Sequence, residues 1–230
     1  MKKIAIIPAR GGSKRIPRKN IRLFLGKPII AYSLEAALDS NLFSEVMVST
    51  DCEKIANISK QYGASVPFLR TDKTSDDHAT IADVVEEVIL NYKQQGLYYE
   101  IICCILPTAP FLTSQRLIEG LDLLEKNEFD SVTPIIKFSY PIQRALQLDE
   151  NNRLSMISPE NLYKRSQDLI PAYHDSGQFY LGRTDSFLKE RSFFMKHGGA
   201  IVIPEIEGQD IDTVEDWYFA EIKYKLLHGT

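Results

Sequence analysis

A glycine-containing loop near the start of the chain is rich in Lys and Arg. Five of the ten residues from Arg10 to Lys19 are Lys or Arg, and no Asp or Glu precedes Glu35. Adjacent glycines let a backbone approach a ligand closely, while Arg offers a planar fork of donors and Lys a point charge. This combination predicts a polyphosphate site, and the plainer alternative is a solvated basic turn. We favour the ligand site because the loop follows a buried-strand pattern at residues 4–7, where open α/β sheets place their ligands.

Two acidic residues near the end of the chain could hold a metal ion. Asp210 and Asp212 stand two positions apart, so in an extended segment both carboxylates point the same way. Mg²⁺ prefers oxygen ligands and usually takes one or two carboxylates together with substrate phosphates. Helix capping is the competing explanation, with Asp212 or Thr213 as the N-cap, and the two roles can coexist.

The elements that must position these residues alternate along the chain. Short apolar runs follow amphipathic stretches, the pattern of βα units around a mostly parallel sheet. Thr80 and Thr113 stand where helices should begin, because a Thr hydroxyl caps a first turn. We expect strands at residues 4–7, 46–50, 66–69 (at an edge), 101–106, 130–136, 179–181 and 200–203 (buried), and helices at 28–40, 53–63, 81–95, 114–124, 184–190 and 214–227.

The regular alternation stops between about residues 137 and 172. A turn-rich segment at 148–152 predicts a hairpin there, and Tyr, Arg and Lys are frequent after it. We interpret this part as a small lobe inserted into one domain that spans residues 1–230. With 230 residues and 44% hydrophobic side chains, the chain can bury a substantial core in a single domain.

Charge and cysteine content narrow the classes of function. Residues 1–34 hold nine of the 27 Lys and Arg and no acidic residue, so the remainder carries 18 basic against 31 acidic side chains, a net charge of −13. A cationic site on an acidic body suits a small anionic ligand and argues against nucleic acid as a partner. Three cysteines are too few for a disulfide framework, and no segment has the length of a signal-peptide core or a bilayer span. We therefore expect a cytoplasmic protein without a membrane partner.

The basic loop resembles a known signature. Its residues Pro8-Ala9-Arg10, Ser13-Lys14, Pro17 and Lys19-Asn20 are similar to the N-terminal motif of the cytidylyltransferases that activate nonulosonic acids. The resemblance implies a Rossmann-like three-layer α/β sandwich with a small inserted dimerisation lobe. It also implies a reaction in which the anomeric hydroxyl of a sugar acid attacks the α-phosphorus of CTP and releases pyrophosphate, with Mg²⁺ as cofactor.

The same resemblance assigns roles to residues of the nucleotide side. Arg10 and Lys19 would contact phosphates, Asn20 would touch the nucleotide, and Asp210 and Asp212 would bind the metal. Lys19, Arg10 and the Asp212-bound metal would stabilise the charge that develops during the reaction. Further nucleotide contacts would come from Ala9, Gly11, Gly12 and Ser13 in the loop and from Arg70, Ala79 and Thr80 near the base. Arg70 has an equally weighted alternative as a surface cation paired with Asp72.

The acceptor side rests on the run Pro171 to Tyr180. Its segment His174-Asp175-Ser176-Gly177-Gln178 is similar to the pseudaminic acid branch of the family, and we expect His174, Asp175, Ser176 and Gln178 to bind substrate. Leu106 stands where sialate-specific members carry a Gln, which suits a sugar ending in a methyl group because no amide would be left unpaired. Plain core packing of Leu106 is the alternative. Arg144 is the expected partner of the sugar's carboxylate, since Arg can pair with it through two hydrogen bonds.

Alternatives remain open at this point. The nearest alternatives keep the reaction but change the sugar acid to sialate or legionaminate, and an octulosonate enzyme fits the loop less well. An alternative from another class is a nucleotide-binding regulatory module that has lost catalysis, which would not need both aspartates together with Lys19. By resemblance we also expect a homodimer in which the lobe reaches the neighbouring subunit.

Overall fold

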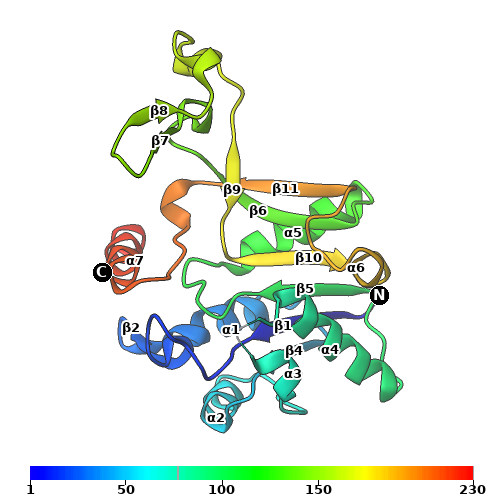
Figure 1. The fold of residues 1–230 in the computed structure, drawn as a ribbon. Coiled ribbons are helices and arrows are strands. Elements are labelled where there is room, and N and C mark those ends of the chain that lie inside the picture. Colours follow the sequence, from blue (N-terminus) through cyan, green and yellow to red (C-terminus); the bar gives the residue numbers. More distant parts are fainter. Residues whose placement is uncertain (77, 230) are drawn as a thin grey trace.

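A mixed seven-stranded sheet forms the centre of the computed structural model, which describes residues 1–76 and 78–229 (Figure 1). Neighbouring strands follow the order β11-β6-β10-β5-β1-β4, and β9 also pairs with β6. The strands are β1 (Lys3–Pro8), β4 (Glu45–Ser49), β5 (Ile101–Ile105), β6 (Ser131–Lys137), β9 (Tyr173–Asp175), β10 (Phe179–Arg183) and β11 (Gly198–Ile203).

The sheet is mixed, although most of its strands run in one direction. β1 pairs in parallel with both β4 and β5, and β11 pairs in parallel with β6. β10 lies antiparallel between β5 and β6, so these five strands share one direction while β9 and β10 oppose it. The predicted α/β class is therefore confirmed, with the reversed strands as the mixed element.

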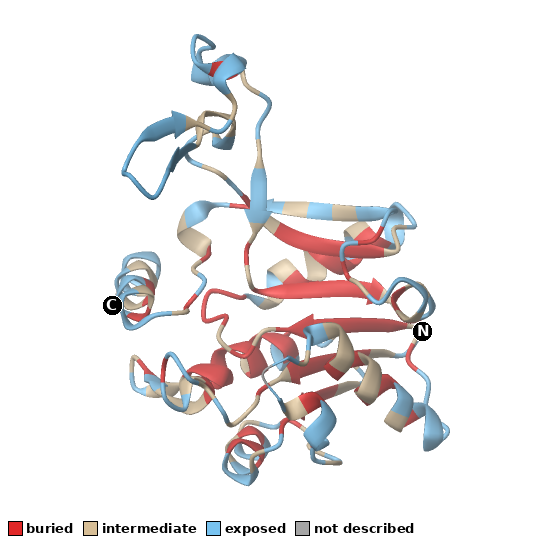
Figure 2. Cartoon of the chain, viewed as in Figure 1, coloured by how far each residue is buried: buried red, intermediate tan, exposed pale blue. Residues whose placement is uncertain are grey.

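Helices cover both faces of the sheet and complete three layers. α1 (Ile29–Asp39), α2 (Glu53–Gln61) and α5 (Ser114–Lys126) pack on one face, and α4 (Ile81–Gln94) and α6 (Thr184–Glu190) on the other. β1 shows how period-two alternation feeds both cores, because Ala5 and Ile7 join the first and Ile4 and Ile6 the second. Both faces of the central strands are therefore buried, as Figure 2 shows by their red colour.

The last helix has its own small core at one end of the sheet. α7 (Val214–His228) buries Trp217 against Phe24 and Tyr32, which belong to the hairpin β2 (Leu23–Phe24) and β3 (Lys27–Pro28) and to α1. The short helix α3 (Asp72–Ser75) precedes α4. Single 3₁₀ turns complete the description: η1 (Lys19–Ile21), η2 (Ile142–Arg144), η3 (Pro159–Asn161), η4 (Ser166–Asp168) and η5 (Glu205–Glu207).

Three helix starts confirm the capping predictions. The Thr80 hydroxyl accepts the amide of Asp83 at 3.2 Å, and the Thr113 hydroxyl accepts that of Arg116 at 3.3 Å. Thr213 does the same for α7, in a reciprocal capping box with Asp216. Asp212 is therefore not the N-cap, and its carboxylate stays available for other partners.

Two strand predictions were wrong in detail, and three strands were missed: the two-residue strands β2 and β3, and β9. Residues 66–69 form no strand, because Pro67 lacks an N–H and the chain leaves the edge of β4 after the bridge between Ser65 and Met47. The strand at 198–203 is not buried: β11 is an edge strand, and Val202 is 56% exposed on its open face. β9 was missed because its residues read as a polar loop.

β9 and β10 lie along the same side of β6 and are separated by a break at residues 176–178. Pro134 lies in β6 between the residues that pair with β10 and those that pair with β9, and its nitrogen carries no hydrogen for a ladder bond. Opposite it, the Ser176 amide donates to the Pro134 carbonyl at 3.2 Å and Gly177 adopts a φ of 66°. The break lies just before Phe179, which pairs with the last residue of β5, Ile105.

A lobe made of residues 138–172 projects from the end of β6 (Figure 1). It contains the predicted hairpin, formed by β7 (Leu146–Leu148) and β8 (Leu154–Met156), together with η2, η3 and η4. Asn161 is the one buried residue of this lobe, all of which the structure describes. Within residues 1–76 and 78–229, no helix combines the length and apolarity that a bilayer crossing requires.

Candidate active site

A cleft of about 460 Å³ opens beyond the carboxyl ends of β1 and β5. Four separate parts of the chain line it: the basic loop, the segment around α3 and the start of α4, the end of β5, and the segment before α7. This is the position that parallel strands create for ligands at the edge of an open sheet. Of the predicted site residues, the cleft is lined by Arg10, Ser13, Lys19, Asn20, Arg70, Ala79, Thr80, Leu106, Asp210 and Asp212.

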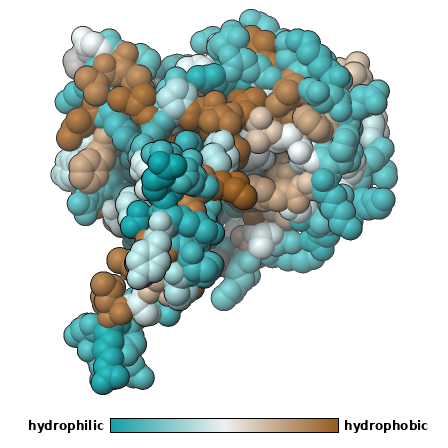
Figure 3. All heavy atoms as spheres, turned by 90° about the horizontal axis from the view of Figure 1, so that it is seen from above, coloured by the Kyte–Doolittle hydropathy of each residue, from teal (hydrophilic) through white to brown (hydrophobic). Residues whose placement is uncertain are grey.

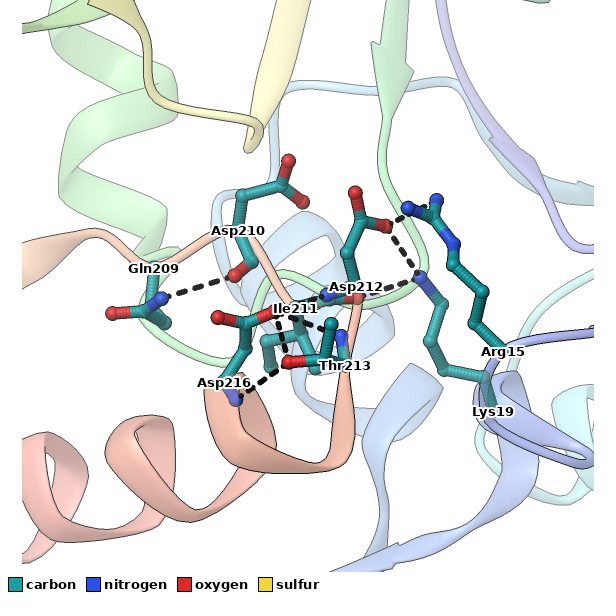
Figure 4. Close-up of polar contacts among 8 residues, drawn as sticks. All are labelled: Arg15, Lys19, Gln209, Asp210, Ile211, Asp212, Thr213 and Asp216. Carbon is teal, nitrogen blue, oxygen red and sulfur yellow. Dashed lines mark hydrogen bonds and ion pairs between the residues drawn. The ribbon is translucent and has the colours of Figure 1, made fainter. Parts of the chain in front are cut away.

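The loop cations and the two aspartates face each other in this cleft (Figure 4). Arg15 Nη2 lies 2.6 Å from Asp212 Oδ1, and Lys19 Nζ lies 3.7 Å from the same oxygen. Lys19 Nζ also donates to the Ile211 carbonyl at 2.7 Å. Residues almost 200 positions apart are thus brought into one site.

Asp210 and Asp212 present their carboxylates to the same side of the extended segment, as Figure 4 shows. Burial raises the pKa of Asp210, the Asp212 carboxylate raises it further, and Lys19 opposes both effects. The two like charges therefore repel, and a cation near both would relieve that repulsion. Two carboxylates beside a cationic cleft fit Mg²⁺ completed by phosphate oxygens, while no cluster of three or more His, Cys, Asp or Glu occurs among the described residues.

The backbone of the loop is held by side chains outside it. Asn20 Nδ2 donates to the Arg10 carbonyl at 3.0 Å, and the Gly11 amide donates to Asp51 Oδ1 at 2.7 Å. A Cβ on Gly11 would stand 3.0 Å from that of Cys52, so the loop approaches the segment after β4 too closely for a side chain. Asn20 therefore acts here on the loop as well as lining the cleft.

Three predicted nucleotide contacts do not line the cleft. Ala9 is fully buried, with its amide bonded to the Ser49 carbonyl at 2.9 Å. Gly11 directs its amide to Asp51, and nothing lies within 4 Å of the position a Cβ would take on Gly12. These residues shape the loop, and their contacts with a nucleotide stay predictions.

Arg70 is buried, so the alternative of a surface cation does not hold. Its Nη2 donates to the Ser49 carbonyl at 2.6 Å and its Nε to the Ser49 hydroxyl at 3.1 Å. Its Nη1 donates to the Thr74 carbonyl at 3.4 Å. Arg70 therefore ties the end of β4 to α3 while it lines the cleft.

Of the six predicted acceptor residues, Leu106 lines the cleft and the other five do not. The Leu106 amide donates to the backbone carbonyl of Gln178 at 2.8 Å. Asp175 accepts a hydrogen bond from Tyr180, and Gly177 lies beside Asp210. By contrast, His174 is exposed on β9 and packs against Phe138 with the two rings tilted by 57° and their centroids 4.8 Å apart.

The remaining acceptor predictions lie away from the cleft surface. Ser176 and Gln178 are each 2% exposed, and Ser176 Oγ and Gln178 Oε1 have no hydrogen-bond partner among the described residues. Arg144 belongs to the lobe and is not among the residues that line the cleft of its own chain. Substrate contacts by these residues stay predictions.

Sequence reasoning assigned no contact in the site to Arg15, Asp51 or Asp76. Arg15 forms the short ion pair with Asp212, and Asp76 accepts from Arg10 through its carbonyl at 3.3 Å. Arg15 belongs to the basic run, so its type was noticed while its partner was not. Asp51 follows directly after β4, and that position at the carboxyl end of a strand was the signal available for it.

The family profile described as cytidylyltransferase matches residues 4–208. Because this covers most of the chain, the chain belongs to the cytidylyltransferase family. Its fold agrees: a solved CMP:2-keto-3-deoxy-manno-octonic acid synthetase complexed with CTP superposes with a TM-score of 0.71 over 100% of both chains, at 18% identity.

Individual relatives narrow the comparison. The pseudaminic acid cytidylyltransferase of Campylobacter jejuni serotype O:2 is 45% identical over 228 residues, which is 99% of this chain and 98% of the relative. The CMP-N,N'-diacetyllegionaminic acid synthase of Legionella pneumophila is 32% identical, over 96% of this chain and 95% of the relative. The resemblance inferred from the loop motif is therefore confirmed.

Proposed function

We propose that this protein transfers CMP from CTP to the anomeric hydroxyl of pseudaminate and releases pyrophosphate. The observation that carries the proposal is the single cleft in which Arg10, Arg15 and Lys19 face Asp210 and Asp212. The identity of 45% with the Campylobacter jejuni enzyme over nearly the whole chain supports the choice of sugar.

On this proposal the loop binds and aligns the triphosphate. Arg10 and Lys19 line the cleft at the end of β1, where their charges would neutralise phosphate oxygens. Lys19 is already held at the cleft by its hydrogen bond to the Ile211 carbonyl. Its side chain therefore has little conformational entropy left to lose when it binds phosphate. In-line displacement at phosphorus requires such alignment and neutralisation more than it requires a covalent nucleophile.

Asp210 and Asp212 would hold Mg²⁺. When bound, the ion would supply charge neutralisation at the α-phosphate and at the leaving pyrophosphate. Asp212 is paired with Arg15 and Lys19. Once the metal binds the Asp212 carboxylate, these two cations would bind the phosphates instead. The raised pKa of Asp210 supports this role, because a carboxylate destabilised by burial and by a neighbouring charge gains most from a cation.

Leu106 supports pseudaminate as the acceptor. It lines the cleft, and its backbone is fixed by bonds to the Gln178 carbonyl and from the Ser33 hydroxyl. A hydrocarbon side chain there leaves no amide unpaired against the terminal methyl group of the sugar. The relative that makes CMP-N,N'-diacetyllegionaminic acid keeps legionaminate as the second candidate, at the lower identity of 32%.

We further propose that the protein works as a homodimer joined through the lobe. Apolar side chains of the lobe are exposed without a core of their own, among them Leu154, Leu162, Tyr163 and Ile170. Hydrophobic residues gather in patches on the face seen from the side of the lobe (Figure 3). A second subunit would bury them. Arg144, whose buried Nε has no hydrogen-bond partner in residues 1–76 and 78–229, would then face the carboxylate of a substrate bound by the neighbouring subunit.

A reducing, cytoplasmic setting completes the proposal. Cys52, Cys103 and Cys104 are all free thiols, and burial raises the pKa of Cys103 and Cys104, which keeps both protonated and unreactive.

Pyrophosphate release tests the reaction and the sugar together. Purified protein is incubated with CTP and Mg²⁺ and with pseudaminate, legionaminate or N-acylneuraminate in parallel. We expect the highest kcat/KM with pseudaminate, and a value about 10²-fold lower with N-acylneuraminate, whose terminal hydroxyl would lie unpaired against Leu106. Turnover with another acid but not with pseudaminate would overturn the choice of sugar. Binding of CTP without turnover of any acid would identify a regulatory module instead.

A further inference from the structure

The segment that carries the two aspartates is held in place from outside the cleft. We call residues 205–212, which include η5, the aspartate segment. At its far end the capping box of α7 fixes it, because Asp216 accepts the amides of both Asp212 and Thr213. At its near end the fixation depends on Glu207, three residues before Asp210.

Arg116 binds the side chain of Glu207. Its Nε and Nη2 lie 3.0 and 2.8 Å from Glu207 Oε2, and its Nη1 lies 2.7 Å from Glu119 Oε2. Arg116 stands in the first turn of α5, which follows the cleft-lining end of β5. Both partners of the Arg116–Glu207 pair are about three-quarters buried, so solvent weakens it less than it would an exposed pair.

Gln178 binds the backbone of the same residue. Its side-chain Nε2 donates to the Glu207 carbonyl at 2.5 Å, and its backbone carbonyl accepts the Leu106 amide at 2.8 Å. Gln178 is 2% exposed and so has little freedom to move. One buried residue therefore fixes the distance between the end of β5 and the aspartate segment.

Two further contacts leave the segment little room. Lys223 of α7 donates to the Gly208 carbonyl at 3.0 Å. A Cβ on Gly208 would stand 2.4 Å from Ile136 Cδ1, so the backbone lies directly against the end of β6. The aspartate segment is therefore clamped by β6, α5, α7 and Gln178, which precedes β10.

We propose that Arg116 and Gln178 are positioning residues that hold Asp210 and Asp212 at the spacing a divalent cation requires. Without the clamp, the repulsion between the two carboxylates would drive the segment outward, and a cation would first have to draw it back. Held in place, the pair is preorganised. Metal affinity then includes no cost of reordering the segment. This inference rests on the metal role proposed for Asp210 and Asp212.

Mn²⁺ binding tests the clamp without turnover. Free Mn²⁺ is measured by electron paramagnetic resonance during titration of the full-length protein, with and without CTP. We expect Arg116→Gln and Glu207→Gln each to raise the Kd for Mn²⁺ by about 5- to 10-fold, near the lower end of the effect of groups that orient metal ligands. The Kd for CTP measured without metal should change less than about 2-fold in both variants, because neither residue lines the cleft.

Matched variants separate positioning from general destabilisation. Glu119→Gln removes the other partner of Arg116, and Glu125→Gln removes the partner of Lys3 at the other end of α5. Both should bind Mn²⁺ like the parent protein. The double variant Arg116→Gln/Glu207→Gln should bind no more weakly than either single variant, because both lose the same contact. Equal losses in Glu119→Gln, or additive losses in the double variant, would overturn the proposal.

Asp212→Asn distinguishes failure of the clamp from failure of the metal site. If Asp212→Asn loses Mn²⁺ affinity while Arg116→Gln and Glu207→Gln do not, the clamp is wrong and the metal site stands. If Asp212→Asn binds Mn²⁺ like the parent protein, both are wrong. Gln178→Glu gives an independent check, because it turns a carboxylate toward the Glu207 carbonyl. It should weaken Mn²⁺ binding, and a raised KM for the sugar acid with unchanged Mn²⁺ binding would assign Gln178 to substrate instead.

Discussion

The sheet body and the lobe bury their apolar residues to very different extents. In the body, consecutive residues of β1 belong to two different cores, and all five residues of β5 are buried. In the lobe, every residue of β7 is exposed, and β8 exposes all but Met156 (Figure 2). The body can therefore support its own fold, whereas the lobe depends on its attachment to β6 and on any surface that covers it.

This difference also separates two kinds of function. The cleft, the basic loop and the aspartate segment belong entirely to the body. Changes in the body should therefore alter chemistry or stability within one chain. Changes in the lobe should act through the assembly of two chains.

Asp212→Asn should have the largest effect of any change in the body. The carboxamide is a neutral and weaker ligand, and it also loses the ion pairs with Arg15 and Lys19. We expect kcat to fall on the order of 10³-fold, comparable to the loss of a principal group that stabilises transition-state charge. Initial-rate measurements over a range of Mg²⁺ concentrations check this.

The control for that variant lies four residues further along the chain. Asp216→Asn weakens the capping box and should lower the stability of the protein by about 1 kcal/mol. Asp212→Asn should leave the melting temperature nearly unchanged, because Thr213 caps α7. Near-normal rates in Asp212→Asn would mean that the metal, if required, binds elsewhere.

How well the sequence predicted each region follows the same division. In the body, alternation of apolar residues and Thr caps are local signals, so β1, β5 and the starts of α4, α5 and α7 were predicted closely. The basic loop and the aspartate pair were found because residue type alone suggested their chemistry. Their mutual contact could only be hypothesised, since no local signal records that Arg15 meets Asp212.

The missed features arise from tertiary contacts. β9 forms because β6 continues beyond Pro134 and offers it a partner strand. The polar residues of β9 give no local signal of this pairing. The exposure of β11 depends on its place at the edge of the sheet, and sequence does not give strand order. Arg116 and Glu207 are 91 positions apart, and each stands in a segment whose charged residues are typical of a solvent-exposed surface. The sequence therefore gives no sign that they pair.

The next largest effect tests the lobe. Leu154→Asp places a charge on the exposed face of the β7–β8 hairpin, where Leu154 pairs across from Leu148. We expect the dissociation constant of the dimer to rise about 10²-fold or more, because burying a Leu contributes about 1.5–3 kcal/mol and a buried charge must be desolvated. Sedimentation at graded protein concentrations measures this.

Leu90→Asp is the matched change in the body. Leu90 is also exposed, on the outer face of α4. Its substitution should leave the state of association unchanged. Dissociation in Leu90→Asp but not in Leu154→Asp would place the interface on the body and contradict the proposed role of the lobe.

A smaller effect is expected from the polar network around Glu45, the first residue of the edge strand β4. Glu45 of β4 accepts hydrogen bonds from the hydroxyls of Ser65 and Tyr99, each at 2.6 Å, and from Tyr92. Glu45→Ala removes the acceptor and leaves buried hydroxyls unpaired, which should lower the free energy of unfolding by about 2 kcal/mol. Urea denaturation measures the change, and Tyr92→Phe/Tyr99→Phe should recover part of it in the Glu45→Ala background.

The same network predicts a dependence of stability on pH. Burial by itself raises the pKa of Glu45, but the hydrogen bonds from Ser65, Tyr92 and Tyr99 outweigh it and lower the pKa below its ordinary value of 4.5. Glu45 therefore contributes its full stability above pH 4.5 and loses it as the pH falls through the lowered pKa of the folded state. Glu45→Gln should flatten the dependence of the unfolding free energy on pH in that acidic range. An unchanged dependence would mean that Glu45 does not cause it.

Asp149→Ala should have the smallest effect. Asp149 Oδ1 accepts the amides of Asn151 and Arg153, each at 2.8 Å, in the exposed turn of the lobe hairpin. Because the turn rests on no buried core, we expect the melting temperature of the protein to change by less than about 1 °C. Thr113→Ala removes a comparable amide acceptor in the body and should cost about 1 kcal/mol, since α5 packs on the main core. Equal losses in the two variants would mean that the hairpin unfolds together with the sheet, and the body and the lobe would then be one cooperative unit.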